Sequence, residues 1–219
     1  MTENLRERVV RWLRAEIISG QMPAKSMISV PGQATSLNIS TTPVREALLE
    51  LSRAGLLRPH RNRGFEVLEP SPDEISQIFE MRVLLEVESA GLAMDRGPID
   101  TVKLRELAGM IEVSAKSNDY RTYIEADREF HRQIAIGSNN FMLLNYITDL
   151  KDRMRLYGLT SPEGQRQQIL SISEHYEIVD LIESGRPEEL KELLARHIKV
   201  WKPIYIAHIR TAHREAVNF

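Results

Sequence analysis

Along the first seventy residues, the spacing of apolar positions changes from one segment to the next. Apolar residues recur every three or four positions from Leu5 to Ile17, and Gly20 follows as a stop, which predicts a first helix. Prolines and a glycine interrupt the next stretch, where a short helix over 31–37 is expected. The segment therefore begins with one clear helix and one short helix.

A stronger helical pattern follows these breaks. Val44 begins an i, i+3, i+4, i+7 apolar stripe that ends at Leu51. Residues 40–42 offer N-caps, Pro43 fits the first turn, and Gly55 is placed to end the helix. Beyond it, "LLR" and "FEVLE" predict two short strands around the turn "PHRNRG".

Helix, short helix, capped helix and hairpin in this order describe a winged helix-turn-helix, whose second motif helix enters the DNA major groove at its N-terminus. Hydroxyls and a guanidinium opposite the apolar stripe can reach phosphates or base edges, and arginines at the hairpin tip can reach the backbone or a minor groove. A small helical domain with solvated arginines would show the same periodicity. The candidate DNA-binding residues are Ser40, Thr41, Thr42, Arg45, Arg61, Arg63 and Gly64.

The stretch "STTPVREALLELSRAGLL", followed by "NRGFEV", closely resembles the winged-helix signature of GntR-family bacterial transcription regulators. That signature runs Val-Ser-Arg-Thr-Pro-Val-Arg-Glu-Ala-Leu, then Leu-x-x-x-Gly-Leu, then a wing glycine. The resemblance implies a double-stranded DNA operator as partner. The chain departs from the pattern at Thr41, where relatives often carry Arg, at Ala24 in place of Gly, and near Val30 in place of a common Glu. An operator sequence is therefore not carried over from relatives.

The segment "EPSPDEI" separates a predicted DNA-binding domain over 1–69 from a second domain over 70–219. Ser71 and Glu74 form a capping box whose first helical residue is Pro72. Helical periodicity then continues with short breaks, and no strand-like alternation appears. The pattern predicts a mainly α chain whose second domain is an antiparallel bundle of about six helices, over 72–95, 99–117, 119–137, 140–158, 163–184 and 187–213.

Charge and composition narrow the expected partners. The net charge of −2 divides into +3 over residues 1–69, with ten basic and seven acidic residues, and −5 over the remainder. A basic N-terminal segment followed by an acidic remainder suggests that the N-terminal segment binds a polyanion. The absence of cysteine excludes disulfides and thiolate metal sites and fits a reducing cytoplasm. Neither a signal peptide nor an apolar run of membrane-spanning length is evident, so a cytoplasmic protein without membrane association is expected.

Histidines in the second domain suggest a metal site. In "EADREFHRQ", Asp127 and His131 are four residues apart and share one face of a predicted helix. His175 and His197 lie in two other predicted helices among apolar neighbours. Three histidines with one carboxylate would suit Zn, Ni, Mn or Fe. Spacing alone leaves open that these are ordinary buried histidines.

The order Asp-x-x-x-His, then Glu-His-Tyr, then Arg-His is similar to the FCD ligand-binding domain of FadR-type GntR regulators, over residues 72–210. The resemblance implies that Asp127, His131, His175 and His197 hold a metal ion whose coordination an effector completes. The expected six helices are more similar to the VanR branch than to the seven-helix FadR branch.

Arg82 falls on the apolar stripe of the first predicted helix of this domain. A buried guanidinium needs a partner. Either Arg82 pairs with Glu86 at i, i+4, or it clamps a carboxylate effector, and the sequence favours neither. FCD domains often show the same Arg-x-x-x-Glu.

The leading functional hypothesis is a homodimeric transcriptional regulator, most simply a repressor, whose operator binding responds to a small organic acid at the metal site. A metal-dependent hydrolase or isomerase is the alternative from another class. Its sequence-adjacent general base would be Glu174, which helical geometry turns about 100° away from His175. A third hypothesis is a constitutive DNA binder whose helical domain only dimerises.

Overall fold

The computed structural model describes residues 4–154 and 158–217. The chain divides into two compact units. The first contains the chain up to Pro70 and a short segment beginning at Asp152, and the second contains the remainder. Each unit has its own set of buried apolar side chains.

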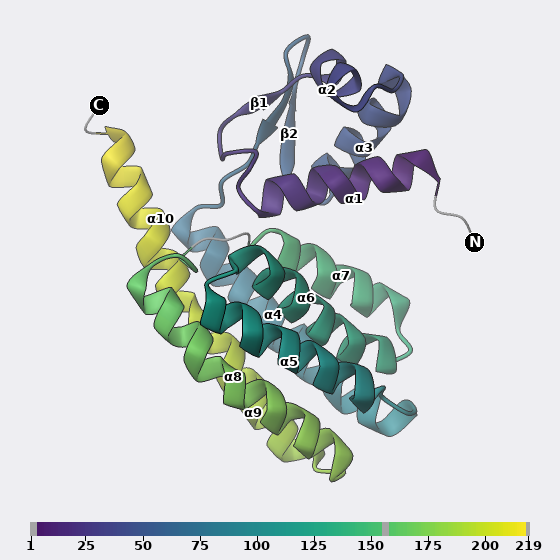
Figure 1. The fold of residues 1–219 in the computed structure, drawn as a ribbon, viewed down its shortest axis with the longest axis vertical. Helices are drawn as coiled ribbons and strands as arrows, with labels where there is room; N and C mark the ends of the chain where they lie inside the picture. The colour runs from purple at the N-terminus through teal and green to yellow at the C-terminus, as the bar shows by residue number, and fades with distance from the viewer. Residues whose placement is uncertain (1–3, 155–157, 218–219) are drawn as a thin grey trace. The chain divides into compact units, whose positions relative to one another are not determined.

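Helices and a small antiparallel sheet make up the described part of the first unit (Figure 1). The sheet has the strand order β1-β3-β2, and α1 and α2 both pack against α3. The elements are α1 (Leu5–Ile18), β1 (Met27–Ile28), α2 (Val30–Leu37), α3 (Thr41–Arg53), β2 (Leu57–His60) and β3 (Gly64–Val67). This is the predicted winged helix-turn-helix.

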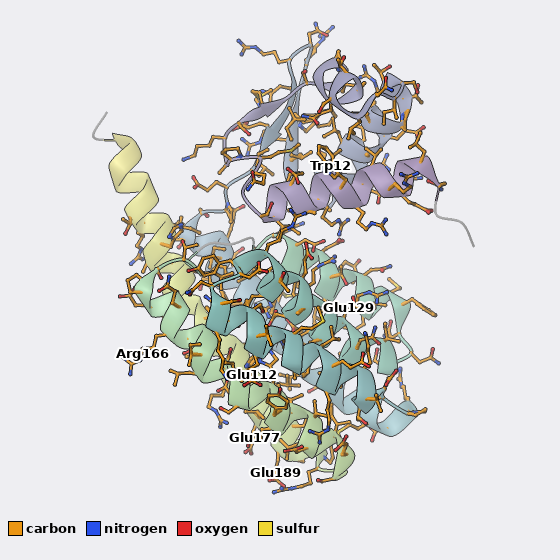
Figure 2. The ribbon with its side chains drawn as sticks, viewed as in Figure 1. Trp12, Glu112, Glu129, Arg166, Glu177 and Glu189 are labelled. Atoms are coloured by element: carbon orange, nitrogen blue, oxygen red, sulfur yellow. The ribbon has the colours of Figure 1, made fainter. Side chains whose placement is uncertain are left out.

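Local sequence explains where the helices of this unit begin and end. Asn4 and Glu7 form a capping box at the start of α1, so the helix begins where its first backbone N–H groups find acceptors. The apolar stripe from Val44 to Leu51 is fully buried on α3. Gly55, with φ of +78°, follows the end of α3 as predicted. Trp12 lies on α1 and packs, partly buried, against the core of this unit (Figure 2).

The sheet contains a strand that sequence periodicity did not predict. Strand β1 has only two residues, and it pairs with β3 so that Ile28 lies opposite Phe65. A two-residue strand is too short to show alternation. The two predicted strands are present, and the turn between them is closed by Asn62 in a left-handed conformation, with φ of 59°.

The described part of the second unit is entirely helical (Figure 1). Helix α4 packs against α6, α9 and α10, while α5 packs against α6 and α8. Its helices are α4 (Pro72–Arg96), α5 (Thr101–Ser117), α6 (Tyr120–Gly137), α7 (Phe141–Asp152), α8 (Pro162–Glu183), α9 (Pro187–Lys199) and α10 (Trp201–Val217). The predicted capping box of Ser71 and Glu74 begins α4.

Two of the predicted helices differ from the structure. The helix predicted over 187–213 is divided at Val200 into α9 and α10, which gives one helical segment more than the six expected. Pro203 explains the break, because it has no N–H for the carbonyl of Lys199 and its ring crowds that carbonyl. The helix predicted over 140–158 ends at Asp152, and residues 155–157 lie outside the described part of the chain.

Among the residues that the structure describes, no helix is both long enough and apolar enough to cross a membrane. The longest helix, α4, carries buried charged groups, Arg82 and Glu86, along its length. Helix α4 therefore packs against other helices of the bundle through charged as well as apolar side chains.

We predict that Gly64→Ala destabilises the first unit more than Gly20→Ala does. Both glycines have positive φ, of +110° and +77°, and a side chain there costs about 1–3 kcal/mol. Only at Gly64 would the new Cβ also lie 2.2 Å from the backbone oxygen of Ile28, which would force β1 away from β3. Urea unfolding, followed by the fluorescence of Trp12 in a Trp201→Phe background, measures the two losses. Equal losses would contradict the prediction.

Candidate metal centre

Four side chains from three helices converge inside the second unit. Asp127 and His131 lie on α6, His175 on α8 and His197 on α9, and their potential ligand atoms all lie within 4.8 Å of one another. The three histidines are buried, and the Asp127 side chain keeps 22% of its exposure. The His131 and His197 rings stack at 5.3 Å between centroids, and His175 meets His197 edge-on at 4.7 Å. The residues singled out by spacing and resemblance thus lie together.

Each histidine has its Nδ1 atom directed at an oxygen outside the cluster. His175 Nδ1–H donates to the Ser171 carbonyl at 2.7 Å, and His197 Nδ1–H donates to Glu174 Oε2 at 2.7 Å. His131 Nδ1 lies 3.2 Å from Glu86 Oε2 but is not aligned for a hydrogen bond. The two hydrogen bonds fix the tautomers of His175 and His197 and leave their Nε2 atoms facing the cluster, as acceptors behind metal-bound imidazoles do.

The shortest spacings of the inner atoms are close to those around a divalent ion. Two metal–ligand bonds of about 2.1 Å at 90–110° place their ligand atoms about 3.0–3.4 Å apart. Asp127 Oδ1 lies 3.3 Å from His175 Nε2 and 3.6 Å from His131 Nε2. Within the described part of the chain, His131 Nε2 is buried and has no hydrogen-bond partner. A buried nitrogen left in this way is unusual for a purely structural histidine.

The protonation states also suit a cation. Partial burial would raise the pKa of Asp127, but Lys151 and His131 outweigh it and hold that pKa well below its usual range. Burial lowers the pKa of His197 to about 4, although its hydrogen bond to Glu174 opposes that shift. At neutral pH the carboxylate is therefore ionised and this imidazole is neutral, the forms that coordinate metals.

Sequence reasoning missed the contact of Lys151 with this cluster and assigned Glu174 a different role. Lys151, near the end of α7, is buried and donates a hydrogen bond to Asp127 Oδ2 at 3.0 Å. Burial lowers the pKa of Lys151, and the Asp127 and Glu86 carboxylates oppose the shift. A single lysine within the helix predicted over 140–158 is typical of a solvated position, so its local pattern did not indicate this contact. Glu174, considered above as a general base, instead accepts the Nδ1 proton of His197.

Of the two alternatives for Arg82, the intrahelical pair with Glu86 is present. Arg82 Nε donates to Glu86 Oε1 at 2.6 Å, both side chains are buried, and the guanidinium lies 5.5 Å from the centre of the Phe79 ring. Arg82 also lines a cavity of about 40 Å³. The metal-ligand candidates Asp127, His131 and His197 and the aromatic residues Tyr123, Trp201 and Tyr205 line the same cavity. Arg82 therefore lines the cavity while it is paired with Glu86.

The candidate DNA-binding residues lie at two places in the first unit. Thr41, Thr42 and Arg45 are exposed on the first turns of α3, and Ser40 precedes them as an N-cap without a side-chain hydrogen bond. Arg61 and Arg63 are exposed in the turn between β2 and β3. Of the ion pairs among described residues, none involves Arg45, Arg61 or Arg63. Gly64 lies next to the backbone of β1.

Most acidic residues of the second unit lie on its outside, in contrast to those of the cluster. Glu112, Glu129, Glu177 and Glu189 lie on four different helices of this unit (Figure 2). Glu177 and Glu189 are exposed, whereas Glu86 is buried against Arg82. Glu86 is therefore an exception to the general charge distribution, and it lies beside His131.

Family comparisons match both units. Residues 5–67 match the model described as bacterial regulatory proteins, gntR family, and residues 77–200 match the FCD domain. The gluconate operon transcriptional repressor of Bacillus licheniformis is 28% identical over 212 residues, covering 95% of this chain and 76% of that protein.

Solved structures agree in fold. Escherichia coli McbR/YncC superposes with a TM-score of 0.82 at 24% identity, covering 90% of this chain and 95% of that chain. The metal-free FCD domain of TM0439 superposes with a TM-score of 0.54 at 24% identity, covering 65% of this chain and 99% of that one. The family matches do not support the metal-dependent hydrolase or isomerase, because they are to DNA-binding regulators. This chain belongs to the gntR family of bacterial regulatory proteins, and it is a transcriptional regulator with an FCD domain.

Proposed function

We propose that this regulator binds a two-fold operator as a homodimer and that a small organic anion, bound at a divalent metal ion in the FCD domain, controls that binding. One observation carries the proposal. Three imidazole Nε2 atoms and Asp127 Oδ1 converge beside a cavity, and hydrogen bonds to Ser171 and Glu174 orient two of the imidazoles. Such a preorganised set is typical of a metal centre.

The donor set limits the ion to a class. Three nitrogens and one oxygen without sulfur suit Zn, Ni, Mn or Fe, and four protein ligands leave positions open in a five- or six-coordinate ion. When bound, the ion would supply positive charge and an open position to a carboxylate. Asp127, His131, His175 and His197 would hold it, and Ser171 and Glu174 would orient two of the imidazoles.

Charge balance supports an anionic effector. The carboxylates of Asp127, Glu86 and Glu174 carry three negative charges, and Arg82 and Lys151 carry two positive ones. With Arg196, whose charge also acts on Glu174, these groups are neutral together, and a divalent ion adds two positive charges that an anion would offset. A buried surplus charge is costly, and this cost favours a carboxylate over a neutral ligand.

The cavity limits the size of the bound group. A volume of about 40 Å³ corresponds to roughly three water molecules at about 10–15 Å³ each. A carboxylate group fits this space, while a larger effector body needs the walls to move apart. Arg82 on the cavity wall is well shaped to meet a carboxylate. Movement of these walls would give the ligand a means to act on the rest of the dimer.

In the first unit, we infer that the first turns of α3 and the turn after β2 contact the DNA. Thr41, Thr42 and Arg45 would face the major groove, and Arg61 and Arg63 would contact phosphates or a minor groove. A two-fold operator requires two copies of this unit, which is why a homodimer is proposed. The name of the gluconate operon repressor supports repression as the mode of control.

We predict that Arg45→Ala weakens operator binding by about 1–3 kcal/mol at equal salt, because a guanidinium at the helix N-terminus reads a base edge. The matched control is Arg53→Ala, since Arg53 is exposed at the opposite end of the same helix and should change affinity little. Fluorescence anisotropy with an operator recovered from genomic DNA fragments that the purified protein captures, titrated at several salt concentrations, measures both. Parental affinity in Arg45→Ala would exclude the proposed placement of α3.

We predict that the purified protein holds one divalent ion per chain and that replacing His175 and His197 with Ala abolishes it. Two of the four donors are then lost, and the remaining pair binds weakly. Elemental analysis after chelator treatment and reloading measures the stoichiometry, and circular dichroism checks the fold. The control is His208→Ala on α10, outside the cluster. If the reloaded parent holds no stoichiometric metal, the cluster is a set of structural histidines.

We predict that Arg82→Lys abolishes the effector response while apo protein still binds the operator. Lysine keeps the charge opposite Glu86 but lacks the planar fork that grips a carboxylate. Operator affinity is measured with and without a panel of small carboxylates, where the parent should change by a factor of about 5–150. An unaltered response in a folded Arg82→Lys protein would remove Arg82 from the effector site. No response in the metal-loaded parent would favour the constitutive DNA binder.

A further inference from the structure

The two carboxylate oxygens of Asp127 face different partners. Oδ1 lies 3.3 Å from His175 Nε2 and 3.6 Å from His131 Nε2, on the side where the imidazole nitrogens converge. Oδ2 accepts a hydrogen bond from Lys151 Nζ at 3.0 Å. A carboxylate can bind a metal ion through one oxygen or through both. Which mode it adopts decides how many positions remain for other ligands.

The position of Lys151 is fixed by its helix. Lys151 lies in the last turn of α7, and its side chain is 8% exposed. Ile147, one turn earlier on the same face, is buried and lines a small pocket together with Glu86 and His131. The packing of Ile147 therefore holds this face of α7 against the cluster and directs the ammonium of Lys151 to Asp127.

We propose that Lys151 is a positioning residue of the metal centre that retains Asp127 Oδ2, so that only Oδ1 is available to the ion. The position that a chelating carboxylate would occupy then stays open for the effector anion. This role rests on the proposed metal centre, and it adds a residue that neither the sequence motif nor the donor set contains. A strong hydrogen bond from a buried ammonium suits the task, because the ion would have to displace it to gain the second oxygen.

The ammonium has a second effect with a definite sign. A positive charge next to Asp127 repels a divalent ion bound at the same carboxylate, and burial weakens solvent screening. Lys151 therefore lowers metal affinity at the same time as it keeps a position open. A centre built for the tightest possible metal binding would lack this lysine, whereas one that exchanges ligands tolerates it.

The test uses full-length protein loaded with Co²⁺, whose visible absorption weakens as its coordination number rises. Lys151→Met removes the ammonium at similar side-chain length, and Lys151→Arg keeps the charge and the donor. Lys116→Met is the matched control, because Lys116 pairs with Glu112 on the surface. Acetate serves as the probe anion, and chelator competition gives the Co²⁺ affinity.

In Lys151→Met we expect weaker absorption than in the parent, Co²⁺ affinity at least about tenfold higher, and no spectral response to acetate. Lys151→Arg should retain the parental spectrum and the parental response to acetate. Lys116→Met should match the parent in spectrum, Co²⁺ affinity and acetate response. Higher affinity with an unchanged spectrum in Lys151→Met would show that the lysine acts only through its charge, and would overturn the positioning role.

A crystal structure of the Co²⁺-loaded parent tests the same proposal without any variant, in case Lys151→Met does not fold. We expect Asp127 Oδ2 to remain on Lys151 Nζ. Both oxygens of Asp127 bonded to the ion would overturn the proposal while leaving the metal centre intact. A parent that binds no stoichiometric Co²⁺ would overturn the metal centre, and the role of Lys151 with it.

Discussion

A carboxylate taken out of water inside a helical bundle must be offset by positive charge or hydrogen-bond donors, and in this protein the constraint falls on Asp127. Its two oxygens meet Lys151 on one side and two imidazoles on the other. Glu86 is subject to the same requirement and meets it with Arg82, while its other oxygen lies next to His131. The ionised groups thus form a connected series across α4, α6 and α7, and the rest of the centre depends on it.

Hydrogen bonds on the outer side of the rings determine which nitrogens of His175 and His197 face the cluster. If their Nδ1 atoms were not engaged from behind, the rings could rotate and offer either nitrogen to the interior. Because Ser171 and Glu174 hold the Nδ1 atoms of His175 and His197, the Nε2 atoms of these rings face the cluster as unprotonated nitrogens. The same geometry explains why Glu174 does not serve as the general base of an enzyme. Its carboxylate is already committed to His197, on the side of the ring away from the cluster.

The break between α9 and α10 brings the metal-ligand candidates and the cavity together. His197 lies in the last turn of α9, and Trp201 begins α10, so the interruption at Val200 falls between a candidate ligand and an aromatic wall residue. Pro203 imposes that interruption by removing a backbone donor. Phe79 and Trp201 both meet Tyr205 edge-on, which packs the start of α10 against α4 beside Arg82. Ligand binding in the cavity would therefore act on the junction of two helices.

The sequence by itself determined the features that follow from local spacing and from family resemblance. The capping box of Ser71 and Glu74 depends on residues three positions apart, and the structure confirms it. The pairing of Arg82 with Glu86 was one of two alternatives that the sequence left open, and the structure contains it. The clustering of Asp127 with three histidines was expected from resemblance to the FCD domain. Only the tertiary structure decided the contact of Lys151 with Asp127 and the pairing of β1 with β3, because each joins residues that are far apart in the chain and whose local patterns are typical of solvent-exposed positions or loops. Such contacts arise from the packing of helices and strands, and the pattern of apolar residues along the chain does not predict them.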